Sequence, residues 1–423
     1  MRNLIHRGAA LLLLLASCAS ARIWTDRHGR AFDGEYYKMD GDRVVLILAN
    51  GRTFSIAVAD LGAADRADLD RQLRTSMPIR QAGTVPAPAP ARTAAPSSNF
   101  GRPWPREIRM DGASACKVIQ EDAKSRRFIY ESPGYRFTAD ARITDDALRN
   151  FAMMFETTRK FALHLPLSLG GRQKNGRMDI LLFGEMNDYI RAGGPPSSAG
   201  CFVPSLGVVM VPMESIGLKK GGTGYSLDTR KKNLVLIHEL AHQLTPHAYF
   251  APGARGWFSE GLAEYLAATP YSWGYFAPDV HGNAVKAYVT GSGSDGTGGR
   301  GLGNQLRAPK LRHLFLMEYG EFSGANGVEN YALGLLVTHY FFHMEGGGRG
   351  ARMRAFLEGL QKGGSGEASL KPLLGGGTYE KLEAEIAAEW AKKAVMIRFG
   401  GLVPGMRHLR MFFRVLHSIG LPE

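Results

Sequence analysis

The sequence is short of cysteine and of long apolar runs, and each shortage excludes a class of protein. It has 3 cysteines in 423 residues, too few for a disulfide-rich secreted scaffold. Its one long apolar run lies at the extreme N-terminus, which excludes a polytopic membrane protein. The 53 glycines show no Gly-X-Y period, which excludes collagen. With 44% hydrophobic and 22% charged residues the chain has a globular balance, and its length predicts two or three domains.

The formal net charge of +13 permits attraction to anionic surfaces but names no partner. We expect no nucleic-acid partner.

Cys116 and Cys201 are the cysteines that remain once the N-terminal segment is set aside. In an oxidising compartment they either form a disulfide or stay two separate buried thiols, because sequence alone does not give their distance.

Residues 1–21 predict a secretory signal peptide. Arg2 and Arg7 precede an apolar core at 9–16 that is too short to span a bilayer. Two processing routes remain open: cleavage after Ala19-Ser20-Ala21, or acylation of Cys18, since Leu15-Ala16-Ser17-Cys18 resembles a bacterial lipobox. Both predict export to the periplasm or the extracellular space, and only the second predicts attachment to a membrane.

The predicted fold class is α+β, in several parts along the chain. Turn signals such as Asp40-Gly41 and Asn50-Gly51 separate short apolar strands near the N-terminus. A stretch rich in proline and alanine follows and favours an extended linker. A mixed β-sheet with helices is expected next, and then a helical lobe. The expected bounds are 22–75 for a small β-barrel, 76–105 for the linker, 106–345 for the main domain and 346–423 for the C-terminal helical region.

The N-terminal part resembles the Src-homology-3-like "Sla homology" domain. The resemblance covers residues 22–74 and is carried by Trp24-Thr25, Gly29-Arg30, Gly41-Asp42, Gly51-Arg52 and Leu61. It implies a binding module whose ligand is unknown. The alternative is a structural cap.

The segment His238-Glu239-Leu240-Ala241-His242 lies in an apolar stretch with helical spacing. Histidines four positions apart lie on one helix face, at the separation that a tetrahedral zinc ion requires. Glu239, one position along, can reach a water molecule in the open coordination position and accept its proton. In a chain with 12 histidines, chance would produce on the order of 0.02 such matches. The alternative is a pair of core histidines beside a surface glutamate.

Glu260 follows His242 by 18 positions, in a second stretch of helical spacing. Together the two motifs resemble the gluzincin metallopeptidases, which include thermolysin and the aminopeptidase N family. The match spans roughly residues 125–345 and is strongest over 233–267. It implies one zinc ion held by His238, His242 and Glu260, with Glu239 as the catalytic base. It also implies that Glu264 orients a ligand histidine, the alternative being a solvated glutamate.

Two further roles follow from comparison with the aminopeptidase N branch. Tyr331-Ala332-Leu333-Gly334 matches the Y-x-x-G helix start whose tyrosine stabilises the oxyanion, although a core tyrosine is the alternative. Glu214, in Met213-Glu214-Ser215, matches only part of the motif that grips a substrate amine. That departure leaves endopeptidase and exopeptidase activity both open. The segment Gly207 to Val211 is expected to pair with an extended peptide as an added edge strand.

Two weaker features remain. His339 and His343 are also four positions apart, but no acid lies between them, and helix-face histidines are the default interpretation. The glycine-rich loop at 291–303 is either a mobile lid or a tolerated insertion.

The sequence therefore predicts an exported zinc metallopeptidase that acts on a peptide or protein substrate. A zinc amidase acting on cell-wall peptides is one alternative. A low-activity binding or scaffold protein is another, although a purely structural zinc site would not need Glu239.

Overall fold

The computed structural model describes residues 22–40, 43–48, 53–66, 69, 99–112, 114–171, 173–196, 198–203, 206–228, 234–291 and 299–400. The predicted signal peptide, with Cys18, lies outside these residues, as does most of the predicted linker. The chain forms two compact units, which divide between Arg92 and Thr93. Within the described residues, no helix combines the length and the apolar character needed to cross a membrane.

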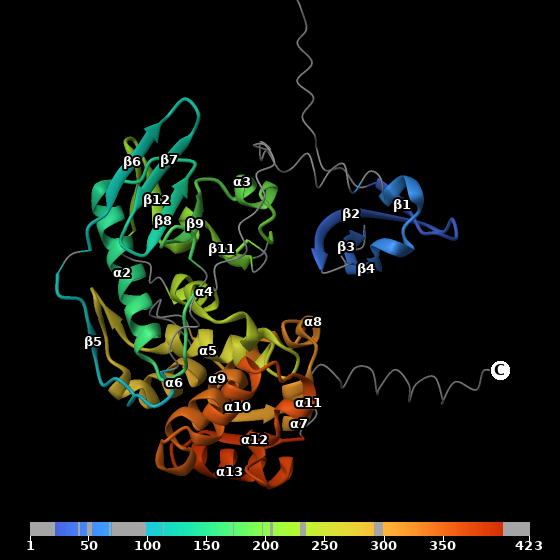
Figure 1. Cartoon of the computed structure of the whole chain (residues 1–423), viewed down its shortest axis with the longest axis vertical. Helices are drawn as coiled ribbons and strands as arrows, with labels where there is room; N and C mark the ends of the chain where they lie inside the picture. The colour runs from blue at the N-terminus through green and yellow to red at the C-terminus, as the bar shows by residue number, and fades with distance from the viewer. Residues whose placement is uncertain are drawn as a thin grey trace, which may run out of the picture. The chain divides into compact units, whose positions relative to one another are not determined.

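The first unit is a four-stranded antiparallel meander in the order β1-β2-β3-β4 (Figure 1). Asp40 pairs with Arg43, so the first expected turn does join two strands as a tight hairpin. A sealed barrel is not found, because no ladder joins β4 to β1 among the described residues. Its strands are β1 (Arg22–Thr25), β2 (Ala31–Asp40), β3 (Arg43–Leu48) and β4 (Thr53–Ala57), and its buried side chains are Trp24, Val44, Leu46, Ile56, Leu61 and Leu69.

The second unit is built on a mixed six-stranded sheet in the order β10-β11-β9-β8-β7-β6. Neighbours β8, β9 and β11 run parallel, and the outer pairs are antiparallel. The parallel step from β8 to β9 requires a crossover, which the 20-residue helix α2 (Asp145–His164) supplies. The strands are β6 (Lys117–Asp122), β7 (Arg127–Glu131), β8 (Tyr135–Ala139), β9 (Met178–Phe183), β10 (Cys201–Val203) and β11 (Val208–Pro212).

The two cysteines of this unit are free thiols, so the disulfide alternative is wrong. Cys201 lies in β10, and Cys116 directly precedes β6, at the opposite edge of the sheet. Five strand spacings of about 4.8 Å separate those edges, roughly 24 Å, whereas a disulfide needs Cα atoms within about 7 Å. Burial raises the pKa of the Cys116 thiol to about 11.

Three helices below the sheet form the centre of the unit (Figure 1): α4 (Leu234–Leu244), α5 (Trp257–Ala268) and α9 (Gly327–His343). All residues of α5 are buried. It crosses α9 where Gly261 faces Gly334: a Cβ on Gly334 would lie 2.7 Å from the carbonyl oxygen of Trp257, and one on Gly261 would collide with Gly334. Glycine on both helices therefore lets the two backbones touch.

The C-terminal part is not a separate helical lobe. Its helices share one hydrophobic core with α4, α5 and α9, and Trp390 donates a hydrogen bond to the Leu336 carbonyl oxygen over 3.1 Å. It ends in a strand, β17 (Met396–Phe399), which pairs in parallel with β16 (Gln305–Ala308). The helices are α10 (Ala351–Gln361), α11 (Gly366–Ser369), α12 (Lys371–Leu374) and α13 (Tyr379–Ala391).

The N-terminal boundary of this unit also differs from the prediction. Asn99 hydrogen-bonds the carbonyl oxygen of Leu165, Phe100 is buried, and Trp104 packs on the core, so this stretch of the expected linker belongs to the folded unit. The other elements are β5 (Ile108–Arg109), α3 (Met186–Arg191), β12 (Leu218–Gly221), β13 (Gly224–Leu227), β14 (Tyr271–Ser272), β15 (Tyr275–Phe276), α6 (His281–Thr290), α7 (Leu311–Leu316) and α8 (Tyr319–Phe322).

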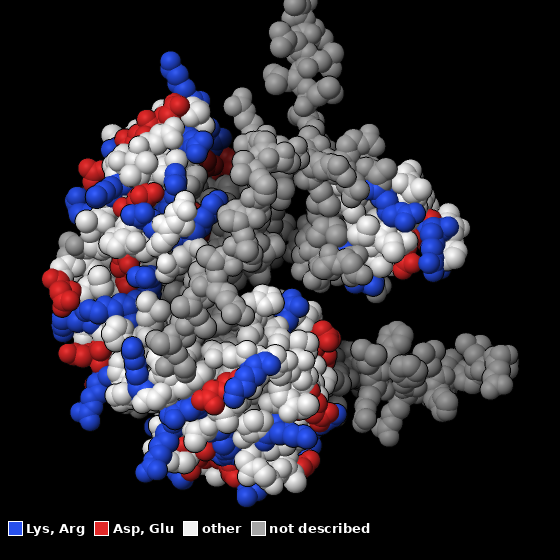
Figure 2. Space-filling model, viewed as in Figure 1, with Lys and Arg blue, Asp and Glu red and all other residues white. Residues whose placement is uncertain are grey.

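Basic and acidic side chains are interspersed on the face of the second unit that Figure 2 shows. Charged side chains of this unit also form ion pairs, such as Arg126 with Asp188 at 2.6 Å and Arg312 with Glu367 at 2.6 Å. On this face the excess positive charge of the chain is therefore distributed over the surface rather than gathered in one patch.

Candidate metal centre

Helices α4 and α5 place the predicted ligands opposite one another. His238 and His242 are one helical turn apart on α4, which the apolar residues Leu236, Ile237 and Leu240 anchor in the core. Glu260 lies in the first turn of α5, where its side chain is only 4% exposed. A buried carboxylate in an apolar helix is costly unless positive groups or a metal ion compensate it.

The three donor atoms converge on one point. His238 Nε2 lies 3.1 Å from His242 Nε2, and Glu260 Oε2 lies 3.2 Å from each of these nitrogens. Ligands bound at 2.0–2.1 Å with tetrahedral angles are about 3.3 Å apart. The near-equilateral triangle therefore fits a single small metal ion, and the donor set of two imidazoles and a carboxylate is one that such ions take.

A chain of polar contacts fixes the outer side of His238. Its Nδ1 lies 3.0 Å from Glu264 Oε1, as expected for a residue that orients a ligand histidine. Arg300 then holds Glu264 with two hydrogen bonds, Nε to Oε2 at 3.0 Å and Nη2 to Oε1 at 2.6 Å. Arg300 comes from the glycine-rich stretch and was not predicted, because nothing in that stretch marks one residue as facing inward.

The electrostatics of the triangle favour a cation. Burial lowers the pKa of His238, but hydrogen bonds to Glu260 and Glu264 outweigh it and raise that pKa to about 10. Burial raises the pKa of Glu260, and His242 and His238 overcome this and hold it far below its usual range. Without a metal ion, the centre therefore retains a proton on His238 between two carboxylates. A metal ion replaces that proton.

Glu239 lies beside the triangle at the edge of the sheet. It follows His238 on α4 and is half-buried. A Cβ built on Gly200 would lie 3.4 Å from Glu239 Cγ. The backbone of Gly200, the residue before β10, therefore lies against the Glu239 side chain. The expectation for 207–211 is wrong: β11 is paired on both sides, by β10 and β9, and β10 is the edge strand next to Glu239.

Two phenols lie close to the triangle. The Tyr331 ring, on α9, stacks on His238 with 6.1 Å between centroids, and the Arg300 guanidinium lies 5.1 Å from the centre of the same ring. Tyr319, from α8, places its hydroxyl 3.4 Å from that of Tyr331. Burial, with Glu260 nearby, raises the pKa of both hydroxyls, so both stay protonated at neutral pH. Tyr319 was missed, since a four-residue helix gives no periodicity to read.

Glu214 lies in the short 3₁₀ turn Met213–Ile216 after β11, and its side chain is exposed, unlike the buried side chains of His242 and Glu260. The role of amine anchor thus gains no support from the geometry.

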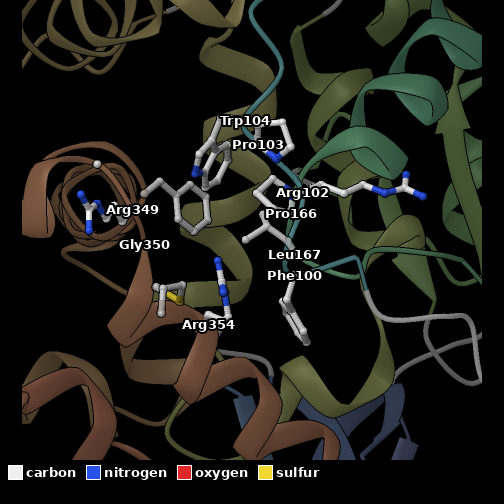
Figure 3. Close-up of a pocket in the computed structure, with 12 residues that line it drawn as sticks. Phe100, Arg102, Pro103, Trp104, Pro166, Leu167, Arg349, Gly350 and Arg354 are labelled. Carbon is white, nitrogen blue, oxygen red and sulfur yellow. The ribbon is translucent and has the colours of Figure 1, made fainter.

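A cavity of about 400 Å³ lies elsewhere in the unit and contains none of these residues. Figure 3 shows Phe100, Trp104 and Pro166 along its wall, with Arg354 pointing into it.

No family model matches this chain, and no curated protein matches it as a relative. The metallopeptidase resemblance and the Sla homology resemblance therefore remain predictions from the motifs.

Proposed function

We propose that this chain is a zinc-dependent metallopeptidase that hydrolyses peptide bonds. The observation that carries the proposal is the triangle of His238 Nε2, His242 Nε2 and Glu260 Oε2, with sides of 3.1–3.2 Å and Glu239 next to it. Three protein ligands leave a fourth position open, which distinguishes a catalytic zinc site from a structural one.

Glu239 is the general base in this proposal. A zinc ion bound to the triangle would supply Lewis acidity and lower the pKa of a water molecule. The Glu239 carboxylate accepts the proton of the attacking water and then delivers it to the leaving amine. Its half-buried place at the sheet edge lets it contact both solvent and a bound chain.

The phenols of Tyr331 and Tyr319 serve as hydrogen-bond donors. Hydrolysis develops negative charge on the carbonyl oxygen, and a donor held nearby stabilises that charge. Because both hydroxyls keep their protons, either can donate. Glu264 and Arg300 do not contact the reacting atoms in this scheme and instead hold His238 in place.

The edge strand β10 supports an extended peptide as the substrate. An edge strand leaves backbone donors and acceptors on its outer side, and a peptide that pairs with them runs alongside the sheet. Since Gly200 adjoins Glu239, such a peptide would place its backbone next to the base.

The test incubates the full chain with a mixed library of free and N-terminally blocked peptides and reads the products by mass spectrometry. We expect cleavage by the wild type and by Glu107→Gln, an exposed control. Glu239→Gln should keep its zinc and lose cleavage. If only free peptides are cut, the enzyme is an aminopeptidase. Zinc-loaded protein that cuts no peptide would refute the proposal and favour cell-wall amides or a binding role.

A further inference from the structure

A second group of three histidines lies outside the metal centre. His339 and His343 are on α9, one turn apart, and His281 opens α6. The structure thus adds a third imidazole to the pair in the sequence. One nitrogen from each ring lies within 4.8 Å of the others, and His281 and His339 are only 1% and 3% exposed.

Tyr265 on α5 holds the outer nitrogens of two of these rings. His281 Nε2 donates to the Tyr265 carbonyl oxygen over 2.9 Å, and His343 Nε2 lies 2.8 Å from the Tyr265 hydroxyl. With its proton on Nε2, neutral His281 keeps a lone pair on Nδ1, and this atom lies 2.9 Å from His339 Nδ1. Histidines that bind metals use one nitrogen for the metal and the other for a fixed backbone or side-chain partner.

The three rings lie next to one another. Their centroids are 4.8 Å apart for His339 and His343, 5.0 Å for His281 and His339, and 5.9 Å for His281 and His343. The pair His238 and His242 in the metal centre has the same separation, 4.8 Å.

All three imidazoles are neutral at pH 7. Burial lowers the pKa of His281 to about 3 and that of His343 to about 4, and it lowers the pKa of His339 as well. The ammonium of Lys393 adds to the effect on His339, but Lys393 is an exposed residue, so this charge remains hydrated. Neutral imidazoles retain the lone pairs that zinc, copper and nickel ions bind.

We propose that His281, His339 and His343 form a second metal site, which takes a divalent ion of the zinc type and fastens α6 to α9. The site goes beyond the proposed peptidase activity. Tyr331 is the one residue of α9 assigned to the metal centre, so His339 and His343 have no role in that activity. His343 is half-buried against Trp104, whose ring is 4.7 Å away and lines the cavity of Figure 3. Because His343 is the least buried of the three histidines, an ion would reach the site past this ring.

The test counts metal ions in the full chain. Protein loaded with zinc and freed of excess ion is analysed by mass spectrometry for zinc per chain. We expect about two ions in the wild type and about one in His242→Ala or in His343→Asn, with almost none in the double variant. His313→Asn is the matched control, because this exposed histidine pairs with Glu321 outside both groups, and it should keep both ions.

A second measurement guards against misfolded variants. The thermal midpoint of His242→Ala should rise when zinc is added, because an ion that binds only the folded state stabilises it, and the double variant should show no rise. One zinc in the wild type, with none in His242→Ala and no change in His343→Asn, would overturn the proposal. The cluster would then be a histidine–histidine hydrogen-bond network. This outcome leaves the Glu239→Gln assay unaffected, so the two proposals fail separately.

Discussion

Replacing Arg300 with methionine isolates the contribution of the contacts behind His238. The substitution keeps most of the apolar stem and removes both hydrogen bonds to Glu264, whose side chain is 2% exposed. Burial then acts on Glu264 with His238 as its remaining charged partner, so the pKa of Glu264 rises from its present lowered value. As pH falls, Glu264 takes up a proton earlier and stops holding His238 Nδ1.

The expected magnitude follows from the burial of this pair. Removing an outer partner of a metal-binding histidine typically weakens metal affinity 10–100-fold, or about 1.4–2.7 kcal/mol, and this is the upper limit for Arg300→Met because Arg300 acts through Glu264. Breaking a buried ion pair also destabilises the fold by about 2–3 kcal/mol here, at the low end because Arg300 is 23% exposed and His238 remains as a partner.

Arg312→Met provides the matched control. Arg312 holds Glu367 with the same two-bond geometry, both at 2.6 Å, but the two side chains are 58% and 47% exposed. An exposed pair contributes about 0–1 kcal/mol, so zinc affinity should not change. The assay is competition for zinc with a chromophoric chelator at pH 8, 7 and 6. Equal zinc affinities for Arg300→Met and Arg312→Met across this range would refute the reasoning.

Three further predictions follow. Gly261→Ala should push α5 from α9 and destabilise the fold by about 1–3 kcal/mol in urea unfolding, whereas Gly359→Ala on α10, where a Cβ meets nothing within 4 Å, should be neutral or stabilising. Tyr331→Phe should lower kcat about 10²–10³-fold with zinc content unchanged, and an equal loss of zinc would argue against a donor role. Arg126 lowers the pKa of Asp188, so this pair contributes stability above pH about 4 that is lost as pH falls through the lower folded value. The stability difference between wild type and Arg126→Met should therefore be present at pH 6 and shrink as pH falls below about 4; a difference independent of pH would exclude the pair as its cause.

The sequence predicts the parts of the centre that are local. His238 and His242 are brought together by the helix period alone, as α4 confirms. Arg300 could not be predicted, since it reaches Glu264 across 36 positions from a stretch without periodicity. The order of strands in the sheet is equally non-local, which is why β11 was expected at the edge.

The pairing of β16 with β17 is also non-local, and it bears on when the candidate metal centre can be completed during synthesis. Arg300 lies five positions before the start of β16, and β16 is paired by β17, which ends at Phe399. Trp390 inserts beneath α9, the helix that carries Tyr331, through its bond to Leu336. A nascent chain that ends before these elements has the histidines and Glu260 but lacks what positions them. We therefore expect zinc to bind the three donor atoms only after nearly the whole chain has been translated, and we expect a chain truncated before residue 396 to bind zinc more weakly.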